Sequence, residues 1–207
     1  IITGAGRAFV AGADIKAMLE FDADEAAAFS KLGHRAFDAI AAIPVPVIAA
    51  INGFALGGGL ELALACDLRY GSEKAQLGLP EVGLSVIPGW GGTQRLGRVI
   101  GWHAARELVY TGKRIKADEA RAKGLLLDVF PADELLAGVN EVADAVAKNG
   151  PLAVRAAKAA ITAGSDAKLA EGLAFEQQAF GGLFGTHDQR EGMTAFVERR
   201  DAKFERN

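Results

Sequence analysis

LGGGLELALACD, residues 56–67, places three glycines directly before an apolar stretch that contains one carboxylate, Glu61. The spacing predicts a glycine-rich turn that leads into a helix ending near Cys66. Apolar residues lie on most faces of this helix, so we expect it to be buried. A buried carboxylate requires a hydrogen-bond partner or a shifted pKa.

Both the glycines and the acid have two interpretations. The glycines either let backbone segments pack tightly, or they let a ligand approach the unpaired N–H groups at the start of the helix. Glu61 either stabilises the helix dipole from the first turn or takes part in a reaction. The stretch by itself leaves both pairs of alternatives open.

The sequence around this stretch alternates between strand-like and helix-like patterns, which is typical of an α/β fold. The expected strands cover residues 1–3, 47–51 and 125–130, and residues 4–14 are expected to form a loop. One expected helix begins at Asp22 or Asp24 and ends near residue 42. Another runs from about residue 91 to residue 100. We therefore predict an α/β core over residues 1–132. Residues 133–207 are predicted to be helical, with breaks near 149–151, 164 and 181–182.

The composition excludes several classes of protein. Half of the 207 residues are hydrophobic, so the chain can bury a core, and a net charge of −3 without a basic run argues against nucleic-acid binding. The longest uncharged apolar run, residues 43–51, contains two prolines and is too short to span a bilayer. One cysteine and three scattered histidines favour neither disulfides nor a metal site. The strand-like opening at Ile1 lacks an initiator methionine, so we expect the N-terminal part of the core to be missing.

A second region rich in glycine and proline, residues 80–92, contains another acid, Glu81. If Glu61 and Glu81 meet in one cleft, they can perform acid and base catalysis on a single water, because each raises the pKa of the other. In the alternative, Glu81 begins a short surface helix after Pro80. The dinucleotide fingerprint, the phosphate loop and the nucleophile elbow each fail at a required residue.

Five segments together resemble the crotonase superfamily, and most closely its enoyl-CoA hydratase branch. They are AGADIK (11–16), NGFALGGGLELA (52–63), LPEVGL (79–84), IPGWGGTQRL (87–96) and DQREGMTAF (188–196). The resemblance covers nearly the whole chain. It implies a spiral of ββα units with a C-terminal helical lobe that forms homotrimers, often paired into hexamers. It also implies an acyl-CoA thioester as substrate, with coenzyme A as part of that substrate and no separate cofactor or metal.

The resemblance assigns a role to each motif residue. The N–H groups of Ala13 and Gly58 would form an oxyanion hole for the thioester oxygen. Residues 13–16 (Ala13, Asp14, Ile15 and Lys16) would line the path of the thioester arm. Glu61 would activate water as a base, Glu81 would protonate the α carbon, and the backbone at Gly89 and Gly92 would position the water and Glu81.

Within the superfamily, the presence of both acids favours a hydratase. From the resemblance we expect a hydratase of fatty acid β-oxidation that acts on short to medium chains. The alternatives are a Δ3-Δ2 enoyl-CoA isomerase, another enzyme that modifies CoA thioesters, or a non-catalytic binding protein. Trp90 is bulkier than the small residue often found at its place in the family, which predicts a narrowed acyl pocket. The high alanine and glycine content indicates a bacterial, cytoplasmic protein, with the mitochondrial matrix as the alternative.

Overall fold

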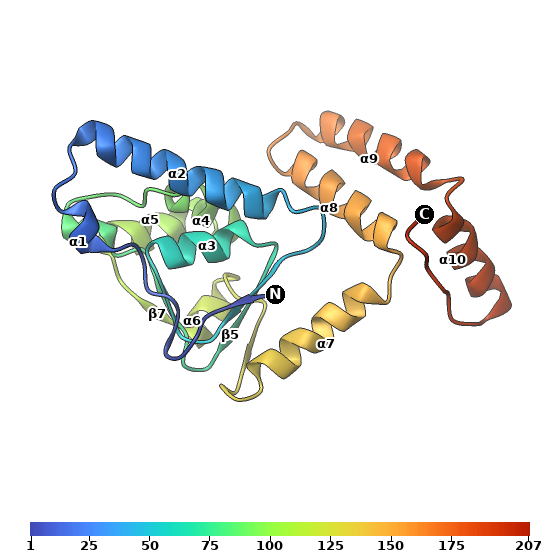
Figure 1. Cartoon of the computed structure of the whole chain (residues 1–207), viewed down its shortest axis with the longest axis horizontal. Helices are drawn as coiled ribbons and strands as arrows, with labels where there is room; N and C mark the ends of the chain where they lie inside the picture. Colours follow the sequence, from blue (N-terminus) through green and yellow to red (C-terminus); the bar gives the residue numbers. More distant parts are fainter. The chain divides into compact units, whose positions relative to one another are not determined.

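The computed structural model describes all residues from Ile1 to Asn207, and they form two compact units. The first unit contains residues 1–43 and 47–140, and the second contains residues 44–46 and 141–207. The first is an α/β unit, as predicted, and the second is helical apart from its loops (Figure 1). Helix α7 (Leu135–Ala147) crosses the division at residues 140 and 141, eight residues beyond the expected boundary at 132 and 133. Leu135 and Val139 in its first turns are buried, which explains why these turns belong to the first unit.

The first unit contains two four-stranded sheets, and the first six strands of the chain alternate between them. One sheet has the order β1 (Ile2–Thr3), β3 (Ile48–Ile51), β5 (Leu68–Ser72) and β8 (Asp128–Phe130), all parallel. The other has the order β2 (Ala8–Val10), β4 (Phe54–Leu56), β6 (Gln76–Gly78) and β7 (Ile115–Lys116). Only the last pair of this second sheet is antiparallel. Each of the first three pairs of strands is followed by helix, so this part of the chain winds as a spiral of ββα turns, as the resemblance implied.

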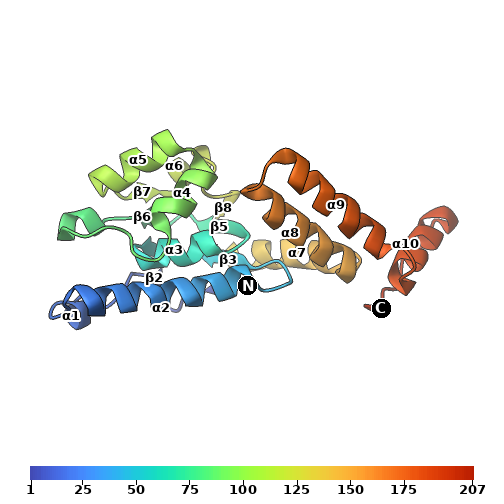
Figure 2. The same cartoon turned by 90° about the horizontal axis from the view of Figure 1, so that it is seen from above.

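The helices of the first unit follow from clear end signals. They are α1 (Ile15–Met18), α2 (Ala23–Ala41), α3 (Gly58–Ala65), α4 (Gly92–Ile100), α5 (Trp102–Thr111) and α6 (Ala117–Ala122), with a short 3-10 helix at Glu81–Leu84. Asp22 and Glu25 form a capping box at the start of α2. Every residue of α3 except Leu62 is buried, so the prediction of a buried helix is confirmed. Helix α2 lies alongside α3 in both views (Figures 1 and 2).

Two expectations for this unit were wrong in detail. The expected loop over residues 4–14 contains strand β2, and the strand expected at 125–130 begins only at Asp128. Strands of two or three residues are too short to show the alternation on which recognition depends. The Asn52 side chain organises the missed segment: its Oδ1 accepts from Gly4 N (3.1 Å), and its Nδ2 donates to the carbonyls of Gly6 (3.1 Å) and Ala8 (3.2 Å).

The second unit contains α8 (Pro151–Ser165), α9 (Leu169–Leu183) and α10 (His187–Glu198). Helices α8 and α9 pack against each other where Gly164 and Gly172 face one another closely. The predicted break near residues 149–151 is confirmed. Those near 164 and 181–182 are confirmed too, because α8 ends at Ser165, one residue after Gly164, and α9 ends at Leu183, one residue after Gly182. None of the chain's helices combines the length and the apolar character needed to cross a membrane.

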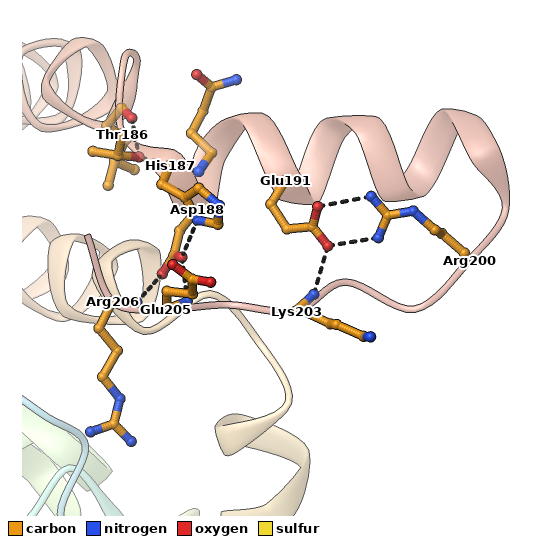
Figure 3. Close-up of polar contacts among 10 residues, drawn as sticks. Thr186, His187, Asp188, Glu191, Arg200, Lys203, Glu205 and Arg206 are labelled. Carbon is orange, nitrogen blue, oxygen red and sulfur yellow. Dashed lines mark hydrogen bonds and ion pairs between the residues drawn. The ribbon is translucent and has the colours of Figure 1, made fainter.

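The C-terminal tail folds back onto α10 through two acidic side chains (Figure 3). The Asp188 carboxylate accepts from the backbone N–H groups of Glu205 (2.6 Å) and Arg206 (2.9 Å). Both oxygens of Glu191 bind the Arg200 guanidinium, at 2.7 and 2.8 Å, and one also accepts from Lys203 N. The Arg200 contact is the main reason why the pKa of Glu191 falls to about 2.

Candidate active site

Glu61 lies in the first turn of α3 and is almost completely buried, with 1% of its surface exposed. Its Oε1 accepts two hydrogen bonds of 2.8 Å, from the backbone N–H groups of Trp90 and Gly92. Gly92 is the first residue of α4, so the N-terminal end of that helix faces the carboxylate, where its dipole favours a negative charge. Burial raises the pKa of Glu61, and the two N–H groups partly oppose the shift.

Glu81 begins the short 3-10 helix after Pro80, so the alternative of a short helix at this place is also correct. Its carboxyl group is not a surface group, however: Oε2 is buried and has no hydrogen-bond partner. Burial raises the pKa of Glu81 to about 7, and the negative charge of nearby Glu61 adds to the shift. A carboxyl group with this pKa is partly protonated near neutral pH and can donate a proton.

The glycine triplet serves three different purposes. A methyl group at Gly57 would lie 3.0 Å from Glu81 Oε1, and the positive φ of +55° also favours glycine there. At Gly58 it would lie 2.6 Å from Cε3 of the Trp90 indole. At Gly59 it would overlap the carbonyl of Val10 in strand β2. The packing interpretation therefore holds for Gly59. Gly57 instead lies next to Glu81, and Gly58 lies next to Trp90.

The loop with Ala13 lies next to this triplet. Strand β2 pairs with β4, and a methyl group at Gly12 would lie 3.2 Å from the carbonyl of Leu56. Asp14 caps the short helix α1 by accepting from Lys16 N at 2.9 Å, and both Ile15 and Lys16 are exposed. Gly58 is the first residue of α3, where no carbonyl of the same helix is available to its N–H.

One backbone donor escaped the sequence analysis. The amide that binds Glu61 together with Gly92 belongs to Trp90, and Gly89 instead accepts from Ser30 Oγ at 2.6 Å through its carbonyl. Both amides are bound to Glu61 rather than to Glu81. Every non-proline residue carries an N–H, so the sequence holds no signal that distinguishes Trp90 from Gly89 as the donor.

Two basic side chains contribute to the electrostatics of the site. Arg95 of α4 forms an ion pair of 2.6 Å with Asp38 of α2, and both Arg95 and His34 favour the ionised form of Glu61. No three His, Cys, Asp or Glu side chains lie close enough together to hold a metal ion.

Two adjacent buried carboxyl groups in different environments can perform acid and base chemistry together. Glu61 has two N–H donors that favour its ionised form, whereas Oε2 of Glu81 has no hydrogen-bond partner and Glu81 has a pKa of about 7. The arrangement suits Glu61 as the base and Glu81 as the acid toward a substrate between them.

Comparison with known proteins agrees with this geometry. The family described as "Enoyl-CoA hydratase/isomerase" matches residues 1–207. A short-chain-enoyl-CoA hydratase of Clostridium acetobutylicum is 48% identical over 201 residues, which cover 97% of this chain and 77% of that protein. A crotonyl-CoA hydratase of Syntrophomonas wolfei is 50% identical over 205 residues, which cover 99% of this chain and 79% of that protein.

A solved structure extends the agreement to the fold. The enoyl-CoA hydratase of Bacillus anthracis superposes with a TM-score of 0.95 at 47% identity, covering 99% of this chain and 80% of that one. The motif resemblance to the crotonase superfamily is thereby confirmed. This chain belongs to the enoyl-CoA hydratase/isomerase family.

Proposed function

We propose that this protein is an enoyl-CoA hydratase, which adds water across the 2,3 double bond of a 2-enoyl-CoA to give a 3-hydroxyacyl-CoA. The observation that carries the proposal is the acid pair: Glu61 accepts two N–H groups, and Glu81 beside it has a raised pKa and an unpartnered oxygen. Hydration requires a base and an acid at neighbouring atoms, and the pair supplies both.

In the proposed reaction, Glu61 removes a proton from water while the water oxygen bonds to C3. The π electrons of the double bond move toward the thioester, and its oxygen becomes negative. The N–H groups of Ala13 and Gly58 stabilise this charge. Glu81 then donates its proton to C2. Exchange with solvent afterwards removes the proton from Glu61 and protonates Glu81 again.

The same proposal covers the remaining parts of the substrate and its surroundings. The exposed segment of Asp14, Ile15 and Lys16 binds the thioester arm of coenzyme A. The enoyl-CoA reacts with water alone, so the proposal includes no metal and no cofactor apart from the coenzyme A of the substrate. We place the activity in fatty acid β-oxidation in the cytoplasm, with the mitochondrial matrix as the alternative. Relatives from Bacillus subtilis and Clostridium acetobutylicum support the first assignment, and relatives named mitochondrial support the second.

A direct assay tests the proposed function. Crotonyl-CoA loses the absorbance of its conjugated thioester on hydration, and chromatography then identifies the product as 3-hydroxybutyryl-CoA. We expect both signals with the wild-type protein. Binding of crotonyl-CoA without any hydration, or conversion of a 3-enoyl-CoA to the 2-enoyl isomer alone, would contradict the proposal and favour an isomerase.

The pH profile is expected to report the acid. Glu81 must be protonated to act, and its pKa is about 7, so kcat/KM should fall as the pH rises through about 7. Steady-state rates with crotonyl-CoA from pH 5 to 9 measure this descending limb. In Glu81→Gln the residual rate should lose the limb, because the glutamine has no proton to lose. A limb that persists in this variant would assign the titration to another group.

We further propose that the second unit mediates a homotrimer, or a hexamer of two trimers. Several large apolar side chains of α8, α9 and α10 have more than 60% of their surface exposed in the single chain. Exposed apolar surface of this kind is typical of a protein–protein interface. They are Ile161, Leu169, Phe180, Phe196 and Val197.

Light scattering on the purified protein should give three or six times the chain mass. We expect the double variant Phe196→Asp/Val197→Asp to lower that mass to the monomer, because two charges replace two of the most exposed apolar groups. Leu19→Asp, at a similarly exposed position of the first unit, is the control and should leave the mass unchanged. A monomeric wild-type protein would contradict this part of the proposal.

A further inference from the structure

The indole of Trp90 is inserted between helices α2 and α3, and each helix presents a glycine to it. A methyl group at Gly33 of α2 would overlap the indole ring, and one at Gly58 of α3 would lie 2.6 Å from its Cε3. The helices leave no room for a side chain at either position while the tryptophan is there. The two glycines and the tryptophan therefore form one packing unit.

Aromatic rings on α2 hold the indole in place. The Phe29 ring centroid lies 5.2 Å and the Phe37 centroid 5.6 Å from that of Trp90, and Nε1 of the indole donates to the Phe29 carbonyl at 3.4 Å. Trp90 is half-buried, so it is a fixed wall rather than a mobile surface group.

This wall adjoins both parts of the proposed reaction site. The N–H of Trp90 binds Glu61, the proposed base, and its ring contacts Gly58, the proposed oxyanion donor. We infer that the Trp90 indole closes the acyl subsite and restricts the enzyme to short 2-enoyl chains; the inference rests on the proposed function.

The order of atoms in the substrate explains the restriction. The proposed function requires the thioester oxygen at Gly58 and C3 beside Glu61. Under the inference, carbons 4 and beyond then extend on the side of Glu61 where Trp90 lies, since the Trp90 amide binds that carboxylate. A crotonyl group ends at carbon 4, whereas a longer chain has to occupy the space of the indole. Without the indole, that space would be lined by Phe29, Phe37 and two glycines, which is an apolar environment suited to methylene groups.

The test compares kcat/KM for oct-2-enoyl-CoA with that for crotonyl-CoA. Burial of each added methylene favours binding about fourfold, so Trp90→Ala should raise the ratio of the two values at least ~10-fold over wild type. Trp90→Leu, which leaves a smaller cavity, should raise it less and serves if the alanine variant does not fold. An unchanged ratio in a folded variant would overturn the inference.

A matched control removes the other tryptophan. The Trp102 indole also packs on a helix glycine, since a methyl group at Gly97 would lie 2.7 Å from its Cδ2. Trp102 belongs to α5, and the two amides that bind Glu61 are those of Trp90 and Gly92. Trp102→Ala should leave the chain-length ratio as in wild type. The same rise in this variant would assign the effect to general loosening of the fold and overturn the inference.

A binding measurement separates the inference from the proposed function. Calorimetry with saturated butyryl-CoA and octanoyl-CoA needs no turnover. If the wild type binds these esters but hydrates no enoyl-CoA, the proposed function is wrong. The binding data still test whether the Trp90 indole limits the length of the acyl chain. We expect Trp90→Ala to strengthen octanoyl-CoA binding relative to butyryl-CoA binding at least ~10-fold. Equal changes for both esters would contradict the inference that the indole closes the acyl subsite.

Discussion

Glu61→Gln and Glu81→Gln should each lower kcat for crotonyl-CoA hydration by ~10²–10⁴, because each removes one of the two proton transfers. Glutamine matches glutamate in size and can neither accept nor release the proton. In Glu61→Gln the amide oxygen can still accept from Trp90 N and Gly92 N, so the loop that carries these groups should keep its place. The loss should therefore appear in kcat, while KM changes little.

The two acids should also behave as one unit. If a single turnover needs both proton transfers, the double variant Glu61→Gln/Glu81→Gln should be only slightly slower than the slower single variant. Glu107→Gln is a suitable control, because the Glu107 side chain is exposed and its carboxylate forms an ion pair with Lys113. A single glutamine variant with more than a tenth of the wild-type kcat would remove that acid from the mechanism.

The local pattern of the sequence was sufficient to predict the part of the fold that carries the acids. The apolar faces around Glu61 predicted a buried helix, and α3 is buried on nearly all its residues. The sequence offered Asp22 and Asp24 as possible starts of α2, and the structure has Asp22 as the N-cap, in a capping box with Glu25. These features depend on residues within one or two turns of helix, which a single sequence displays directly.

The remaining features depend on contacts between distant segments. Strands β2, β4 and β6 each have three residues, and their place in the sheet comes from pairing across more than twenty residues of chain. The donation from Trp90 N to Glu61 joins residues 29 positions apart and uses a group that every such residue has. By contrast, the helix ends at Ser165 and Leu183 were predictable, because each lies one residue after a glycine at which a break was expected.

Gly58→Ala is expected to lower kcat for crotonyl-CoA by ~10²–10³, the usual cost of losing one donor of an oxyanion hole. The added methyl group would lie within 2.6 Å of Trp90 Cε3, so either the indole or the start of α3 has to shift. Both carry groups of the proposed site, since the N–H of residue 58 is the proposed oxyanion donor and that of Trp90 binds Glu61. Gly97→Ala is the matched control: its methyl group would meet the Trp102 indole in the same way, away from Glu61, and kcat should stay within ~3-fold of wild type.

A double variant distinguishes the two interpretations of this glycine. The nearest atoms to a methyl group at Gly58 all belong to the Trp90 ring, so the methyl group points at the indole rather than along the N–H. Removal of the indole in Gly58→Ala/Trp90→Ala should then let α3 return to its place and recover at least ~10-fold of the lost kcat, measured against Trp90→Ala alone. No recovery would mean that the methyl group itself obstructs the thioester. Glycine at position 58 would then be required by the substrate and not by the tryptophan beside it.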